Sequence, residues 1–188
     1  MPELHDEMNV IDDQAYKGMI KKLSDGVGVK GAVTSIKHYK PDQNGDFERG
    51  GIKYKLFEER SVENTLCDLG NALAAKIFAD NTGTRPSHMS VGETSGGKTS
   101  ASTVLEAPVA PRVALDSTTC PASGNPGDNI IVYVCTFVAG VGSGALKEAG
   151  LFNHLTAGTM ICYAEYGIIT KEAADIVNFT WTITFGSS

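Results

Sequence analysis

The chain has 188 residues, 41% hydrophobic and 20% charged, so it can bury a substantial core and is not disordered. Its net charge of −6 excludes a general nucleic-acid binder, which needs clustered lysine and arginine. No run approaches the roughly 18 apolar residues of a membrane helix, and the acidic start "MPELHDEMNV" is unlike a signal peptide. We therefore expect cytosolic synthesis, with neither membrane nor nucleic acid as a partner.

Residues 1–28 differ in pattern from everything that follows. Apolar residues recur at spacings of three and four on a charged background, which predicts an amphipathic helical arm closed by Gly26 and Gly28. Such a terminal segment must bury its stripe on its own domain or on a neighbour, and both readings stay open. The stripe also includes Ala15, and the candidate docking residues are Met8, Ile11, Tyr16, Met19, Ile20 and Leu23.

From Val29 onward the apolar period becomes two, which predicts a strand, the turn "PDQNGD" and a second strand. A helix over about 62–80 follows, capped by Ser61 or alternatively Asn64. Gly70 inside this helix costs about 1 kcal/mol relative to alanine, which indicates close packing at that point. The predicted apolar stripe is Val62, Leu66, Leu69, Leu73 and Ile77.

The second half of the chain is predicted to be β. In "VNFTWTITF" the apolar residues alternate with polar ones, so one face, including Trp181, is predicted to be buried. "NIIVYVCTFVAG" is apolar on both faces, which indicates a central strand or an outer face that meets another subunit. The candidate strands are 85–91, 104–115 with a break at Pro108 or Pro111, 129–139, 145–152, 160–169 and 175–185.

Together these elements predict a mainly β protein with two parts, an arm over 1–28 and a domain over 29–188. The domain is expected to be an antiparallel, jelly-roll-like β-sandwich with one packed α-helix, preceded by the N-terminal helical arm.

The stretch "GETSGGKTS" matches the phosphate-binding pattern G-x-x-x-x-G-K-[ST], with Gly92, Gly97, Lys98 and Thr99 in register. A working site needs a buried strand before it and a helix that begins at the lysine. Here a weak short strand precedes the motif, and Pro108 and Pro111 leave little room for a helix after it. We interpret the match as a chance one in a loop, so that Lys98→Ala should leave every property unchanged.

No other constellation predicts catalysis. The sequence has no G-x-S-x-G and no H-E-x-x-H, and its cysteines and histidines are scattered, without the short spacings of zinc sites. His38 is expected to be exposed, and Glu148 and Glu165 are the acids to check for burial. The prediction is no enzyme, cofactor, metal or small-molecule substrate, with free and mostly buried cysteines; a later disulfide at Cys120 stays open.

The order of elements resembles a type of small virion protein of tailed bacteriophages. The resemblance covers about 29–185 and follows an opening strand pair, "SVENTLCDLGNALAAKIF", the Gly/Ser/Thr-rich loop in "HMSVGETSGGKTSASTVLEAPVAPRV", the "KEAGLF" element and the closing "WTITF". It implies a structural protein with no catalytic residues, and residues 1–28 lie outside it.

On this basis we expect a capsid decoration (cement) protein, located in the virion on the capsid surface after assembly in the host cytoplasm. The implied partners are the major capsid protein and copies of itself, most plausibly in a trimer. A tail, baseplate or fibre-attachment component is the alternative. A host-glycan-binding module is a further alternative, although the aromatic content of 7% and a buried Trp181 count against it.

Overall fold

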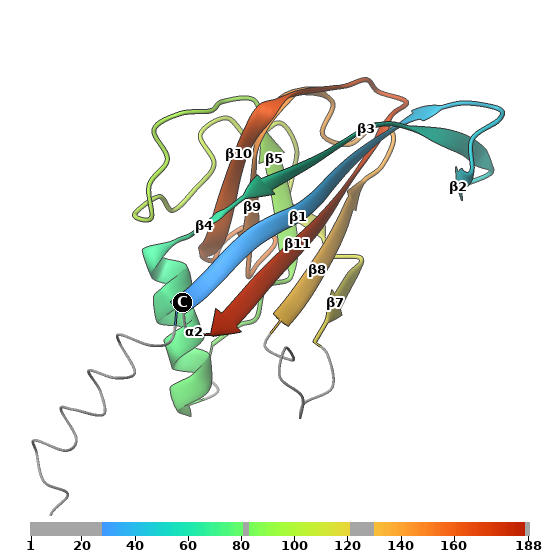
Figure 1. Ribbon diagram of the computed structural model, residues 1–188. Helices are drawn as coiled ribbons and strands as arrows, with labels where there is room; N and C mark the ends of the chain where they lie inside the picture. The colour runs from blue at the N-terminus through green and yellow to red at the C-terminus, as the bar shows by residue number, and fades with distance from the viewer. Residues whose placement is uncertain (1–27, 81–82, 121–129, 187–188) are drawn as a thin grey trace, which may run out of the picture.

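The computed structural model describes residues 28–80, 83–120 and 130–186, and these form two antiparallel β-sheets and one helix (Figure 1). The mainly β class and the single helix are as predicted. The N-terminal arm lies outside the described residues. Within the described ranges, no helix is long and apolar enough to cross a membrane.

The first sheet has the strand order β2-β3-β1-β11-β8-β7. The long strand β1 pairs with β11 from Gly28↔Gly186 to Tyr39↔Ile176 and with β3 on its other side. β8, which contains the doubly apolar segment, lies between β11 and β7 in the sheet. Its outward-facing Val132 and Val134 are only half-buried, so both interpretations of that face stay open. The bounds are β1 Gly28–Pro41, β2 Phe47–Arg49, β3 Ile52–Glu63, β7 Ser117–Thr119, β8 Ile130–Phe137 and β11 Ile176–Gly186.

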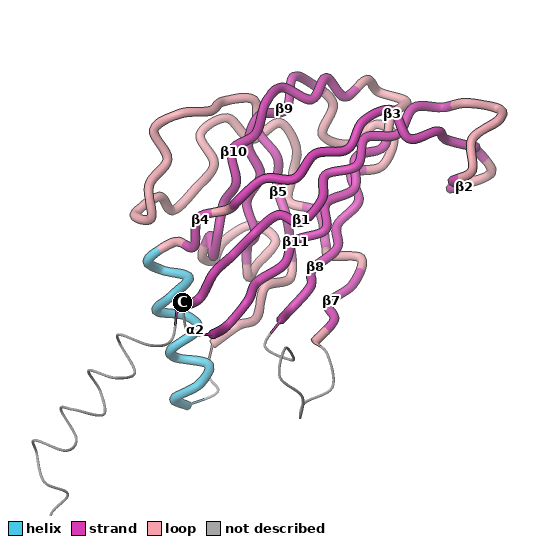
Figure 2. The backbone as a smooth tube through the Cα atoms, in the orientation of Figure 1, coloured by secondary structure: helices cyan, strands magenta, loops and turns pink. Residues whose placement is uncertain are grey.

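The second sheet has the order β4-β10-β9-β5-β6, and the chain passes between the two sheets at both edges. At one edge β3 leads through Asn64 directly into β4; at the other, β6 leads through residues 115–116 into β7. Figure 2 shows the passage from β3 into β4 as a continuous stretch of the tube. The bounds are β4 Thr65–Leu66, β5 His88–Gly92, β6 Val113–Ala114, β9 Gly144–Phe152 and β10 Met160–Lys171.

The larger of two buried apolar clusters lies between the sheets. Strand β11 contributes Phe179 and Trp181, both 0% exposed, while Leu146 and Leu151 of β9 meet them from the other layer. The alternation predicted for β11 is confirmed, because Asn178 and the threonines between the apolar residues are only half-buried.

The helix α2, Asp68–Asp80, begins later than predicted. Val62 pairs with Val33 in the first sheet and Leu66 pairs with Cys162 in the second, so both stripe residues belong to strands. Cross-strand pairing therefore overrides the helical period at these positions. The close packing predicted at Gly70 is confirmed, since a Cβ there would lie 2.1 Å from the carbonyl oxygen of Ile161.

The strand predicted over 104–115 is mostly wrong. Only Val113–Ala114 forms a strand, and Pro108 makes an isolated bridge to Gly92. The prolines remove backbone donors, so this segment is a long loop after β5, drawn pink in Figure 2. The short strands β2 and β7, three residues each, were not predicted because they are too short for a period to appear.

Candidate functional site

The loop that matches the phosphate-binding pattern begins where β5 ends. Gly92 is buried, and a Cβ there would lie 2.4 Å from Glu148 Oε1, so only glycine fits beside that carboxylate. Gly96 and Gly97 have φ of +94° and +90°, a conformation that favours glycine. After Thr99 the backbone continues as a turn and then a loop as far as Arg112. A phosphate-binding site would instead need a helix that begins directly at the lysine.

Lys98 of this loop forms an ion pair with Glu148 of β9. Its Nζ lies 3.7 Å from Oε2 of Glu148, and the two side chains are 10% and 0% exposed. Oε1 of the same carboxylate accepts hydrogen bonds from the backbone N–H groups of Glu106 (3.0 Å) and Ala107 (3.1 Å). Of the two acids singled out for a burial check, Glu148 is buried and Glu165 is half-buried. This ion pair leads us to replace the expectation that Lys98→Ala changes nothing: the substitution should destabilise the fold, because it would leave a buried carboxylate without its cation.

Two further carboxylates fix the same loop to the second sheet. Glu165 accepts a hydrogen bond from the backbone N–H of Gly96 at 2.8 Å, and Glu93 accepts one from Ala145 N–H at 3.0 Å. Carboxylates therefore occupy the Gly96 amide and the Lys98 ammonium, two of the motif's groups that would otherwise attract a phosphate. The arrangement is a tethered loop with negative charge at its base.

A cluster of charged side chains surrounds His38. The prediction that His38 is exposed is wrong, because its exposed fraction is 0%. Its Nε2 lies 2.8 Å from Asp175 Oδ2, and its Nδ1 lies 3.2 Å from Glu58 Oε1. The other oxygen of Glu58 accepts from Arg60 Nε and Nη2, at 2.9 and 2.6 Å. His38 lies two residues after Ile36 on the inward face of β1, and that parity was the available sequence signal.

Charges in this cluster compensate one another. Burial raises the pKa of Glu58, but hydrogen bonds from Arg60 and His38 outweigh it and hold that pKa below the ordinary 4.5. Both ring nitrogens of His38 lie within hydrogen-bond distance of a carboxylate oxygen. The fully buried ring cannot meet a substrate, and the cluster therefore acts in packing β1 against β3 and the start of β11.

The cysteines are free: Cys67, Cys135 and Cys162 are buried and Cys120 is exposed. Burial is the main cause that raises the pKa of Cys67 to about 11 and of Cys135 to about 12, so these thiols are weak nucleophiles. Among the residues that the structure describes, no three His, Cys, Asp or Glu side chains gather closely enough to hold a metal ion.

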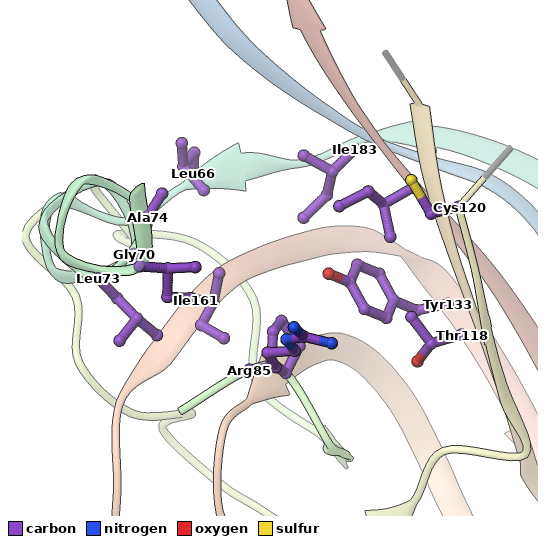
Figure 3. A pocket seen from close by; sticks show the side chains of 13 residues that line it. Leu66, Gly70, Leu73, Ala74, Arg85, Thr118, Cys120, Tyr133, Ile161 and Ile183 are labelled. Carbon is purple, nitrogen blue, oxygen red and sulfur yellow. The ribbon is translucent and has the colours of Figure 1, made fainter. Parts of the chain in front are cut away.

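An apolar cavity of about 660 Å³ lies between α2 and the two sheets. Figure 3 shows Leu73 and Ala74 of the helix on one side, and Tyr133 and Thr118 of the first sheet on the other, together with Cys120, which directly follows β7. No local sequence pattern indicates this cavity, because its walls come from segments far apart in the chain. The remaining lining residues are Leu66, Gly70, Ile77, Arg85, Pro86, Ile131, Ile161 and Ile183.

A second, polar hollow of about 710 Å³ lies on the outer face of the first sheet. The rings of Tyr39 and Phe47 stack at its side with centroids 4.9 Å apart. Asn178 and Asp116 line it as well, with Arg49 lying 3.8 Å from Asp116. Aromatic faces next to amide and carboxylate groups can bind a polar ring-shaped ligand.

Exposed apolar side chains concentrate on β3. Ile52, Leu56 and Phe57 are 49%, 41% and 61% exposed, and Lys40 Nζ lies 4.3 Å above the Phe57 ring. Figure 1 shows that the β2–β3 hairpin projects beyond the body of the two sheets. Large exposed apolar groups on a projecting element are typical of contact surfaces between proteins.

The candidate docking residues of the arm, Met8 to Leu23, lie outside the described residues. No protein-family model matches the chain, and comparisons with curated proteins and with solved structures return no significant match. What can be inferred about function therefore depends on the residues and surfaces described above.

Proposed function

We propose that the chain is a non-enzymatic virion structural protein, a capsid decoration protein that binds the outer lattice of a phage head and stabilises it. The observation that carries this proposal is the set of exposed apolar residues Ile52, Leu56 and Phe57 on the projecting β3. By contrast, the charged groups that suggest chemistry, Lys98 with Glu148 and His38 with Asp175, are paired with each other inside the fold.

In this proposal the domain is a jelly-roll-like sandwich that forms a homo-oligomer, a trimer, on the capsid surface. β3 contacts the major capsid protein, and the helical arm adds a second contact through the stripe Met8 to Leu23. Each contact can be weak, because repeated engagement on a lattice raises the effective concentration of the next one.

The first experiment measures the copy number of this chain relative to the major capsid protein in purified virions, by quantitative mass spectrometry. A ratio comparable with one places the protein on the head lattice. A ratio far below one moves it to the tail, baseplate or fibre attachment, the alternative structural role. Complete absence from virions contradicts the proposal.

The role of β3 is tested with Leu56→Asp and Phe57→Asp, each measured for binding to purified heads. Both should weaken binding at least tenfold, since each places a charge in an apolar contact. Val104→Asp is the matched control, because Val104 is also exposed (57%) but lies in the loop after β5. Equal binding by all three variants would remove β3 from the contact.

A host-glycan-binding module is the second candidate, and the polar hollow is the observation that favours it. Tyr39 and Phe47 offer ring faces, while Asn178 and Asp116 offer hydrogen-bonding groups. A glycan array with the parent protein and with Tyr39→Ala tests this candidate. Binding that disappears with Tyr39 supports it, and an array without any signal rejects it.

A further inference from the structure

The apolar cavity beside α2 needs an occupant. Its volume of about 660 Å³ leaves room for many water molecules against a mostly aliphatic wall. Water gains few hydrogen bonds from such a wall, because Leu73, Ile131 and Ile161 offer only carbon atoms. Covering the cavity with apolar side chains is therefore favourable.

A segment of the same chain with matching chemistry begins at the edge of this cavity. Ile183, which lines the cavity, pairs with Gly31, three residues after the start of β1 at Gly28. The 27 residues before Gly28 carry an apolar stripe from Met8 to Leu23 that has to be buried.

We propose that, in the free protein, this stripe packs into the cavity of its own chain. Leu23 lies five residues before Gly28, and five extended residues span about 17 Å, so the stripe can reach the cavity. A helix over 8–23 would be about 24 Å long. The short connection gives the arm a high effective concentration at its own cavity compared with that of a second copy.

Charge supports this occupant. Arg85 lines the cavity and is exposed, and no described carboxylate lies within 4.0 Å of its guanidinium. The arm carries Asp12 four residues after Met8, on the same predicted helix face as the stripe, and this carboxylate can pair with Arg85. The arm also carries Lys17, Lys21 and Lys22, so the charge argument rests on Asp12 and not on the arm's net charge. The proposal does not depend on the virion role: on a capsid, the same stripe would leave the cavity in order to dock on a neighbour.

Cys120 is a natural probe of the covered state, because it lines the cavity and is the exposed cysteine while Cys67, Cys135 and Cys162 are buried. We expect a thiol reagent such as DTNB to modify Cys120 slowly in the full-length protein. Met19→Asp should speed this reaction about tenfold, because it removes an apolar anchor from the docked arm. Gln14→Asp is the matched control: it adds the same charge on the opposite side of the predicted helix and should leave the rate unchanged.

A Met19→Cys variant treated with a short bismaleimide decides which chain supplies the arm. A link between the introduced thiol and Cys120 within one chain, found by peptide mapping, supports the proposal. A dimer linked through the same two positions overturns it in favour of a second copy. Equal DTNB rates for the parent, Met19→Asp and Gln14→Asp also overturn it, because the arm then leaves the cavity uncovered. Circular dichroism of each variant verifies that the sheets are intact.

Discussion

Replacing Lys98 with methionine tests the reading of the loop directly. The substitution keeps the length of the side chain but removes the ammonium that faces Glu148 Oε2 at 3.7 Å. Breaking a buried ion pair by removing one partner costs about 3–5 kcal/mol, since the remaining charge stays buried. Glu106 and Ala107 N–H still hydrogen-bond to the other oxygen, so we expect the lower end, about 3 kcal/mol.

Urea unfolding, followed by circular dichroism, measures this loss of unfolding free energy. For a chain of this size, 3 kcal/mol corresponds to a decrease of about 6–12 °C in Tm. Lys76→Met is the matched control, since Lys76 is exposed on α2 and should change stability by less than about 0.5 kcal/mol. A loss of less than about 0.5 kcal/mol for Lys98→Met would refute the reasoning.

A double-mutant cycle separates the pair from the rest of the loop. Glu148→Gln removes the charge but keeps an oxygen for the two backbone N–H groups. If the pair is responsible, Lys98→Met should cost at least about 1 kcal/mol less in the Glu148→Gln background. Additive losses would show that Lys98 acts through contacts other than this carboxylate.

Three other outcomes follow from the structure. Hydrogen bonds from Arg60 and His38 outweigh burial and lower the pKa of Glu58, so the ionised carboxylate stabilises the fold above pH 4.5. This contribution is lost as the pH falls through the lowered pKa. In urea titrations at a series of acidic pH values, the unfolding free energy of Glu58→Gln should therefore decrease less steeply with falling pH than that of the parent. Gly70→Ala should destabilise the protein by about 2 kcal/mol, because the clash with the Ile161 carbonyl exceeds the gain of about 1 kcal/mol in helix propensity. Ala72→Gly, at an exposed helix position, is the control and should cost about 1 kcal/mol. A Gly70→Ala variant more stable than the parent would contradict the packing argument. Millimolar ATP with Mg²⁺ should leave the Tm of the parent unchanged in differential scanning fluorimetry, and any increase that Lys98→Met abolishes would restore the nucleotide site.

Features that depend on local pattern could be predicted from the residues alone. The alternation in "VNFTWTITF" identified the buried face of β11, because a strand presents successive side chains to opposite faces regardless of its neighbours. The opening pair of strands, the β-rich second half and the packing at Gly70 follow from the same kind of evidence. The prolines after Thr99 were enough to argue against a helix there.

Features that depend on which distant segments meet could not be predicted in this way. His38 and Asp175 are 137 residues apart, and their hydrogen bond exists only because β1 pairs with β11. Val62 has a helical spacing to its neighbours, yet pairing with Val33 places it in a strand. The sequence motif alone suggests that Lys98 binds phosphate, whereas in the fold Lys98 pairs with Glu148 of β9. Local periodicity reports the conformation of one segment, whereas burial, charge pairing and cavities are set by the contacts between segments.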